Sequence, residues 1–151
     1  MVRQVAVPPT ARARSTLSRP DYEDAFVLET GAAQERTGEE WARALLEDAP
    51  AGMQRSLRRG WCALGLMLGS TRDERRVLGW EVRRRAPEFA LLAADSRLGM
   101  VGEVLVERRP RALLVATFIQ MRNPLARLVW AGASPGHRQA VRDLLEGVAA
   151  R

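Results

Sequence analysis

Alternation of apolar and polar positions predicts strands in two parts of the chain. Residues 22–29 alternate with a period of two and contain aromatic and β-branched side chains, which is typical of a half-buried strand. The period of two returns at residue 77 and continues to residue 121, interrupted only by short turns. Two of these later runs, 89–94 and 112–121, are apolar on both faces. Short connections between the runs predict an antiparallel meander.

Helical spacing lies between the first strand and the meander, and again after the meander. The segment 37–40 matches a capping box, and an apolar stripe with helical spacing follows over residues 53–68. Asn123-Pro124 is a typical helix start, and the helical pattern then continues towards the C-terminus. Pro135 leaves open whether this last element is one long helix or two helices in succession.

These elements predict an α+β fold with one domain over residues 21–151. Two short helices follow the first strand, and a long C-terminal helix follows the antiparallel strands. Residues 1–20 contain three prolines and four arginines without stable periodicity, so we expect an extended N-terminal arm that adds a first strand or wraps the body. With 151 residues, of which 46% are hydrophobic, the chain is able to bury a core.

The order of elements is similar to the helix-grip arrangement of the START-like (SRPBCC) superfamily. Locally, Trp80, the strand that leads into Pro124, and His137-Arg138 in the last helix resemble an actinobacterial branch of that superfamily. The resemblance covers residues 20–150 and implies a curved antiparallel sheet around the C-terminal helix, with an apolar cavity between them. The superfamily includes polyketide cyclases, lipid carriers and hormone receptors, so the resemblance implies a cavity and not one chemistry. The pattern shows fewer clear strands than such a sheet normally has, so short strands or the N-terminal arm must supply the edges.

Charge adds little to this picture. All 24 basic residues are arginine and the formal net charge is +6, but such one-sided usage is typical of a GC-rich genome and is weak evidence for an anionic partner. The arginine runs at 83–85 and 108–111 lie at strand ends, with no aromatic residues between them and no known DNA-binding motif. A solvated rim is therefore favoured over a nucleic-acid surface.

Single occurrences of reactive residues exclude several classes of site. Cys62 has no partner for an internal disulfide, and His137 is the only histidine, so we expect no metal and no cofactor. No run is apolar enough for a membrane span and the first residues do not resemble a signal peptide, so we expect a cytoplasmic location. A homodimer through an edge strand or the N-terminal arm remains open.

Large apolar side chains of the strands and the last helix are the candidates for lining a ligand cavity. They are Trp80, Phe89, Leu91, Val104, Phe118 and Trp130. Filling the core is the alternative use of these side chains. Gln120 shares the strand parity of Phe118, which makes it the preferred polar candidate for orienting a ligand, ahead of Thr117 and Arg122.

Glu103 and His137 are the candidates for catalysis. If Trp80, Val104 and Phe118 point inward, Glu103 is solvated; if the parity is reversed at Glu103, it becomes a buried carboxylate suited to act as a general base. His137 is the only imidazole available for a proton shuttle at neutral pH, with packing at a helix start as the alternative.

Residues 132–136 match G-x-S-x-G, but a nucleophile elbow requires a strand before the serine, so a helix cap is favoured. We therefore predict that the protein binds a small apolar or aromatic molecule between the sheet and the C-terminal helix. The alternative is a cofactor-independent, cyclase- or dehydratase-like enzyme that acts on a polyketide-type substrate and uses Glu103 or His137 to move a proton.

Overall fold

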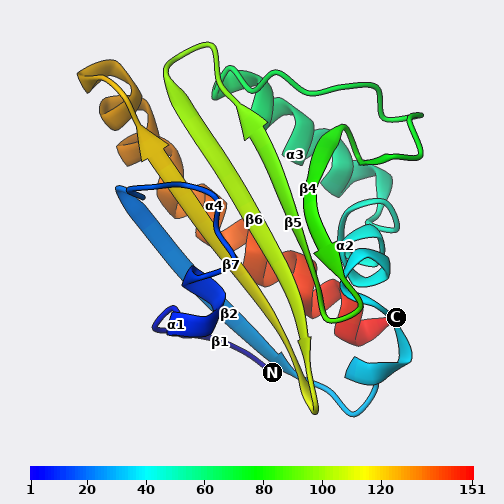
Figure 1. Ribbon diagram of the computed structural model, residues 1–151. Coiled ribbons are helices and arrows are strands. Elements are labelled where there is room, and N and C mark those ends of the chain that lie inside the picture. Colours follow the sequence, from blue (N-terminus) through cyan, green and yellow to red (C-terminus); the bar gives the residue numbers. More distant parts are fainter.

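A single antiparallel sheet of seven strands forms the centre of the computed structural model, which describes residues 1–151 (Figure 1). In chain order, the strands are β1 (Val2–Val5), β2 (Tyr22–Glu29), β3 (Arg76–Val77), β4 (Trp80–Ala86), β5 (Phe89–Asp95), β6 (Met100–Arg109) and β7 (Ala112–Met121). Within the sheet they lie in the order β1-β2-β7-β6-β5-β4-β3, so the sheet is open, with β1 and β3 at its edges. The predicted meander is thus confirmed as β4–β7, and short strands and the N-terminal arm supply the remaining edges.

Five helical segments accompany the sheet. They are α1 (Pro9–Arg12), the 3₁₀ turn η1 (Ala33–Glu35), α2 (Gly38–Leu46), α3 (Ala51–Ala63) and α4 (Pro124–Ala150). The predicted capping box is present at the start of α2, where the Glu40 amide donates to the Thr37 hydroxyl and the Thr37 amide donates to the Glu40 carboxylate. The last element is one helix that continues through Pro135, which decides between the two alternatives left by the sequence.

Two close approaches fix helices against the sheet. Gly38, the first residue of α2, lies directly on the backbone of Phe89, and a Cβ at position 38 would collide with that backbone. Gly99 has a φ of +92° in the turn between β5 and β6, a conformation that favours glycine. A side chain at position 99 would also collide with Asn123, which caps α4 by accepting from the Ala126 amide at 2.7 Å and donates to the Leu98 carbonyl. The start of α4 is therefore held against the β5–β6 turn.

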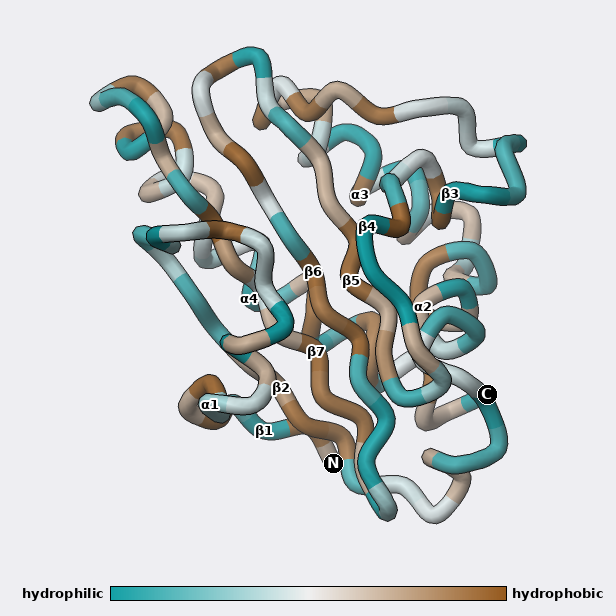
Figure 2. Tube along the Cα trace, viewed as in Figure 1, coloured by the Kyte–Doolittle hydropathy of each residue, from teal (hydrophilic) through white to brown (hydrophobic).

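The sheet is covered on both faces. We call the face that packs against α2, α3 and α4 the helix face, and the face that packs against the N-terminal arm (residues 1–20) the arm face (Figure 1). The arm does both things the sequence suggested, because β1 pairs with β2 at the sheet edge and the residues after it lie across the sheet. Figure 2 shows the apolar residues concentrated along the central strands.

Each face has its own apolar cluster. The helix face contributes Phe26, Leu28, Leu92, Val106, Leu113 and Val115, which pack with α2 and with Val141 and Leu145 of α4. The arm face contributes Ala25, Val27, Phe89, Leu91, Leu105, Leu114, Ala116 and Phe118, which pack with Val7 and Ala11. Because both faces are buried, the strands at 89–94 and 112–121 are apolar on both sides. The architecture is α+β and consistent with a helix-grip-like fold. None of the helices combines the length and the apolar composition that crossing a membrane requires.

Candidate ligand-binding site

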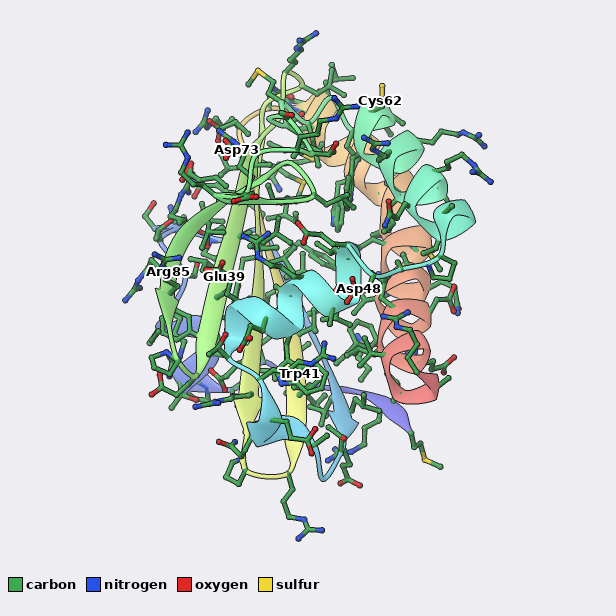
Figure 3. The ribbon with its side chains drawn as sticks, turned by 90° about the vertical axis from the view of Figure 1, so that its right-hand side faces the viewer. Glu39, Trp41, Asp48, Cys62, Asp73 and Arg85 are labelled. Atoms are coloured by element: carbon green, nitrogen blue, oxygen red, sulfur yellow. The ribbon has the colours of Figure 1, made fainter.

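A cavity of about 970 Å³ lies between the helix face of the sheet and the helices α2, α3 and α4. Most of its lining residues are hydrophobic, and its volume is in the range of small-molecule sites, about 300–1,000 Å³. Seen from the side in Figure 3, the sheet and α4 stand opposite each other, and α2 crosses the space between them. The cavity is therefore framed by the longest helix and the central strands.

Helix α3 covers the cavity with one side only. Met53, Leu57 and Trp61 line the cavity, and Leu57 is the only buried residue of the helix. The Trp61 ring meets the Trp80 ring edge to face, with 5.6 Å between the ring centroids. The end of the cavity near α3 and β4 is therefore aromatic.

The structure divides the predicted ligand-binding residues between the two faces of the sheet. Trp80, Val104 and Trp130 line the cavity. Phe89, Leu91 and Phe118 do not, because they belong to the cluster of the arm face. Gln120 has the parity of Phe118 and is not a lining residue either.

The pairing register explains this correction. Val104 lies opposite Thr117, and Glu103 lies opposite Phe118. Residues opposite each other in a sheet share a face, so Phe118 cannot point to the same side as Val104. Thr117, which was ranked behind Gln120, is the polar residue of β7 that faces the cavity.

Glu103 is fully buried, but its carboxylate is on the arm face. It accepts hydrogen bonds from the Ser15 hydroxyl at 2.5 Å, from the Thr16 amide at 3.2 Å and from the Thr16 hydroxyl. Arg83 lies 3.6 Å from it. Of the two alternatives for Glu103, the solvated one, which the sequence favoured, is wrong because the N-terminal arm covers the side chain. The strand around Glu103 borders the cavity, but the carboxylate is engaged on the opposite side, so this placement does not support a role as general base there.

His137 lines the cavity from α4. Its Nε2 atom lies 3.3 Å from Oδ2 of Asp24, although the geometry does not make a hydrogen bond. Its ring is 5.2 Å from that of Trp130. Residues 132–136 lie inside α4, so the G-x-S-x-G match has no strand before it, and Ser134 is not a helix cap.

Asp24 of β2 is the centre of a buried polar group at this end of the cavity. The Tyr22 hydroxyl donates to Oδ2 of Asp24 at 2.6 Å, and Arg138 donates to the Tyr22 oxygen at 3.3 Å. Burial, together with the hydrogen bond to Asp24, raises the pKa of Tyr22 to about 12. Tyr22 therefore stays protonated and holds one oxygen of Asp24 while the other remains free.

Four polar side-chain atoms near this end of the cavity have no hydrogen-bond partner, although Asp24 itself is not a lining residue. They are Oδ1 of Asp24, Oγ1 of Thr117, Nε1 of Trp130 and Nε2 of His137, which we call the polar cluster. Buried polar atoms are normally paired, so this concentration of unpaired atoms is unusual. The sequence does carry a signal for Asp24, since the period of two places this carboxylate on the same face as Tyr22 and Phe26.

No group of three or more His, Cys, Asp and Glu side chains comes together in an arrangement that could hold a metal ion. Comparison with known proteins yields no family model, no curated protein and no solved structure that matches the chain.

Proposed function

We propose that the protein binds a small hydrophobic or aromatic molecule in the cavity between the sheet and α4. The observation that best supports this proposal is the cavity itself, which has a volume of about 970 Å³ and is lined mostly by hydrophobic side chains. Protein interiors are otherwise close-packed, and an apolar hollow of this size lacks the contacts that stabilise a core. A ligand that fills it restores those contacts and removes apolar surface from water.

Membership of the START-like (SRPBCC) superfamily is part of this proposal. The open antiparallel sheet, the two helices after β2 and the long C-terminal helix on the sheet support it. The hollow between sheet and helix is where such an architecture holds its ligand.

Titration with the neutral, environment-sensitive dye Nile red tests the binding function. We expect saturable binding by the unaltered protein and weaker binding in Val104→Phe, which places a bulkier side chain in the cavity. The matched control is Leu128→Phe on the outer side of α4, where the leucine is 73% exposed. Equal dye binding by both variants would assign the dye to the surface and contradict the proposal.

A second function, a cofactor-independent cyclase- or dehydratase-like activity, is favoured by the pair of His137 and Asp24 beside the cavity. In that reaction, His137 takes a proton from the carbon next to a substrate carbonyl, and Asp24 stabilises the protonated ring. The experiment uses a linear poly-β-ketone thioester as the substrate. We expect His137→Gln to lose turnover and to keep Nile red binding; turnover equal to that of the unaltered protein would exclude the histidine.

A further inference from the structure

The cavity opens to solvent between α3 and α4, which are not packed against each other along their length. A Cβ atom added at Gly60, Gly132 or Gly136 would meet no atom within 4 Å, so these positions face open space. We call this opening the mouth. The exposed lining residues that border it are spaced by three or four residues on each helix and are Gly52, Ser56, Gly60 and Ala63 on α3 and Gly132, Gly136 and Gln139 on α4.

The mouth carries a negative charge, that of Asp143. This residue lines the cavity from α4 and is partly exposed, so it lies where the cavity meets solvent. The side-chain amide of Gln139 donates to Oδ1 of Asp143 at 2.9 Å. No arginine or histidine forms an ion pair with this carboxylate. The charge of Asp143 is therefore available to a group in the mouth.

No positive charge of the chain balances Asp143 inside the cavity. The sequence has 24 basic residues, all of them arginine, and none of them lines the cavity. Arg55 approaches the mouth beside Gly52 without being a lining residue. The other acidic lining residue, Glu103, holds its carboxylate on the arm face. An anionic ligand would lose water in this cavity without gaining a cationic partner, which is unfavourable.

The interior suits an apolar body next to a cationic end. Trp61 is on α3, the helix that borders the mouth opposite Asp143, and its ring meets that of Trp80 edge to face. Aromatic rings of this kind pack against apolar groups, and their faces attract ammonium ions. A cation at the mouth also keeps part of its hydration, so it avoids most of the unfavourable desolvation of a fully buried ion.

We propose that the ligand is a hydrophobic amine, whose positively charged amino group pairs with Asp143 at the mouth while its apolar or aromatic body fills the cavity. This inference rests on the proposed binding function, since it specifies the class of ligand that the same cavity takes.

Three probes with one body and different ends test the inference: para-phenylbenzylamine, para-phenylbenzyl alcohol and para-phenylbenzoate. Isothermal titration of the full chain at neutral pH measures their dissociation constants. We expect the amine to bind about three- to fivefold more tightly than the alcohol, the size of effect that one partly exposed ion pair gives. The benzoate should bind more weakly than the alcohol, because its charge lacks a partner.

Substitutions at Asp143 should change this order. Asp143→Asn keeps an acceptor for Gln139 and should make the amine and the alcohol bind equally, and Asp143→Arg should favour the benzoate over the amine. The matched control is Glu146→Gln, at an exposed position of α4 that does not line the cavity. Since it removes the same charge from the same helix, it should keep the preference for the amine.

The outcomes separate this inference from the proposed function. Equal binding of the amine and the alcohol by the unaltered protein, tightest binding of the benzoate, or a preference that survives Asp143→Asn overturns the inference and leaves the binding function intact. Equal loss of the preference in Glu146→Gln also overturns it, because net charge would then be the cause. No binding of any probe contradicts the proposed function as well. Thermal unfolding of each variant confirms that it is folded.

Discussion

Buried carboxylates lie on both faces of the sheet, and the chain pairs Glu103 and Asp24 to different extents. On the arm face, both oxygens of Glu103 accept hydrogen bonds from Ser15 and Thr16. On the helix face, Asp24 has one oxygen occupied by Tyr22 and the other without a partner, beside a cavity. A carboxylate with every partner supplied by the chain stabilises the fold, whereas one that lacks a partner keeps a hydrogen-bonding capacity that the chain does not use. The comparison shows that two buried acids of one sheet can differ in how completely the chain pairs them.

The arm face is closed by additional contacts from the N-terminal arm. The Arg14 guanidinium lies 4.0 Å above the centroid of the Phe89 ring and 3.1 Å from the carboxylate of Glu107. Arg84 donates to the Arg14 carbonyl at 3.0 Å. We therefore expect substitutions on this face to act on stability, and substitutions on the helix face to act on binding.

Phe118→Ala should have the largest effect. Phe118 is completely buried in the close-packed cluster of the arm face, so its truncation should lower the free energy of unfolding by about 3–5 kcal/mol. Trp61→Ala removes a larger side chain from the wall of an existing cavity and should cost less than half as much, because part of its surface is already exposed. Urea unfolding of the two variants measures the difference. Equal losses would show that the helix face is packed as tightly as the arm face.

Glu103→Ala should release the N-terminal arm. It leaves the donors of Ser15 and Thr16 and the charge of Arg83 without their acceptor, so we expect a loss of about 3 kcal/mol and faster tryptic cleavage at Arg12 and Arg14. Glu29→Gln, at a side chain that is 73% exposed, is the control and should change stability by less than about 0.5 kcal/mol. An unchanged rate of tryptic cleavage in Glu103→Ala would mean that the arm is held by its apolar contacts alone.

The same type of substitution, threonine to valine, should change stability in opposite directions on the two faces of the sheet. Thr117→Val removes a buried hydroxyl that has no partner and should leave the ligand-free protein as stable as before, or more stable by up to about 1 kcal/mol. Thr16→Val removes a hydroxyl that donates to Glu103 and should destabilise by about 1 kcal/mol. Thermal unfolding of both variants compares them, and a clear loss of stability in Thr117→Val would contradict the unpaired state of that hydroxyl.

The smallest effect concerns pH. Tyr22 is the only tyrosine, so the tyrosinate absorbance reports this side chain alone. Burial and the hydrogen bond to Asp24 raise its pKa from 10.0 to about 12, and Asp24→Asn should lower it by removing the charge next to the phenol. Because the folded protein holds this proton more tightly than the unfolded chain, the contribution of Tyr22 to stability is complete below pH 10 and is lost as the pH rises through 12. Tyr22→Phe should remove that dependence; a midpoint near pH 10 in the unaltered protein would show a solvated phenol.

Local patterns predicted the elements well because each depends on neighbours in sequence. The capping box at Thr37, the start of α4 at Asn123 and the strand at 22–29 all involve contacts within a few residues. The runs at 89–94 and 112–121 were visibly apolar on both sides, but the covering of the second face by the N-terminal arm was not deduced from them. The order of the elements, and the candidate residues Trp80, Val104, Trp130 and His137 that line the cavity, could also be predicted from the sequence.

The assignment of residues to the two faces of the sheet was harder to predict from the sequence, because it depends on contacts between residues far apart along the chain. Phe118 and Val104 were expected on one face, but the register of β6 against β7 places Thr117 opposite Val104. The burial of Glu103 requires Ser15 and Thr16, which are more than 80 residues away along the chain. Asp24 was missed although its parity was visible, because a single carboxylate in an apolar alternation gains meaning only when His137 is brought beside it.

Helix α3 covers the cavity, but Leu57 is its only buried residue, and its arginines and Cys62 are exposed. Segments with few buried contacts open at a lower free energy than the strands beneath them, so its amides should exchange with solvent well before those of β6 and β7. We therefore expect α3 to move away from the cavity at a lower free energy than the sheet needs to unfold. Cys62 is the only thiol of the chain, so a single fluorescent label on it would report such a movement directly.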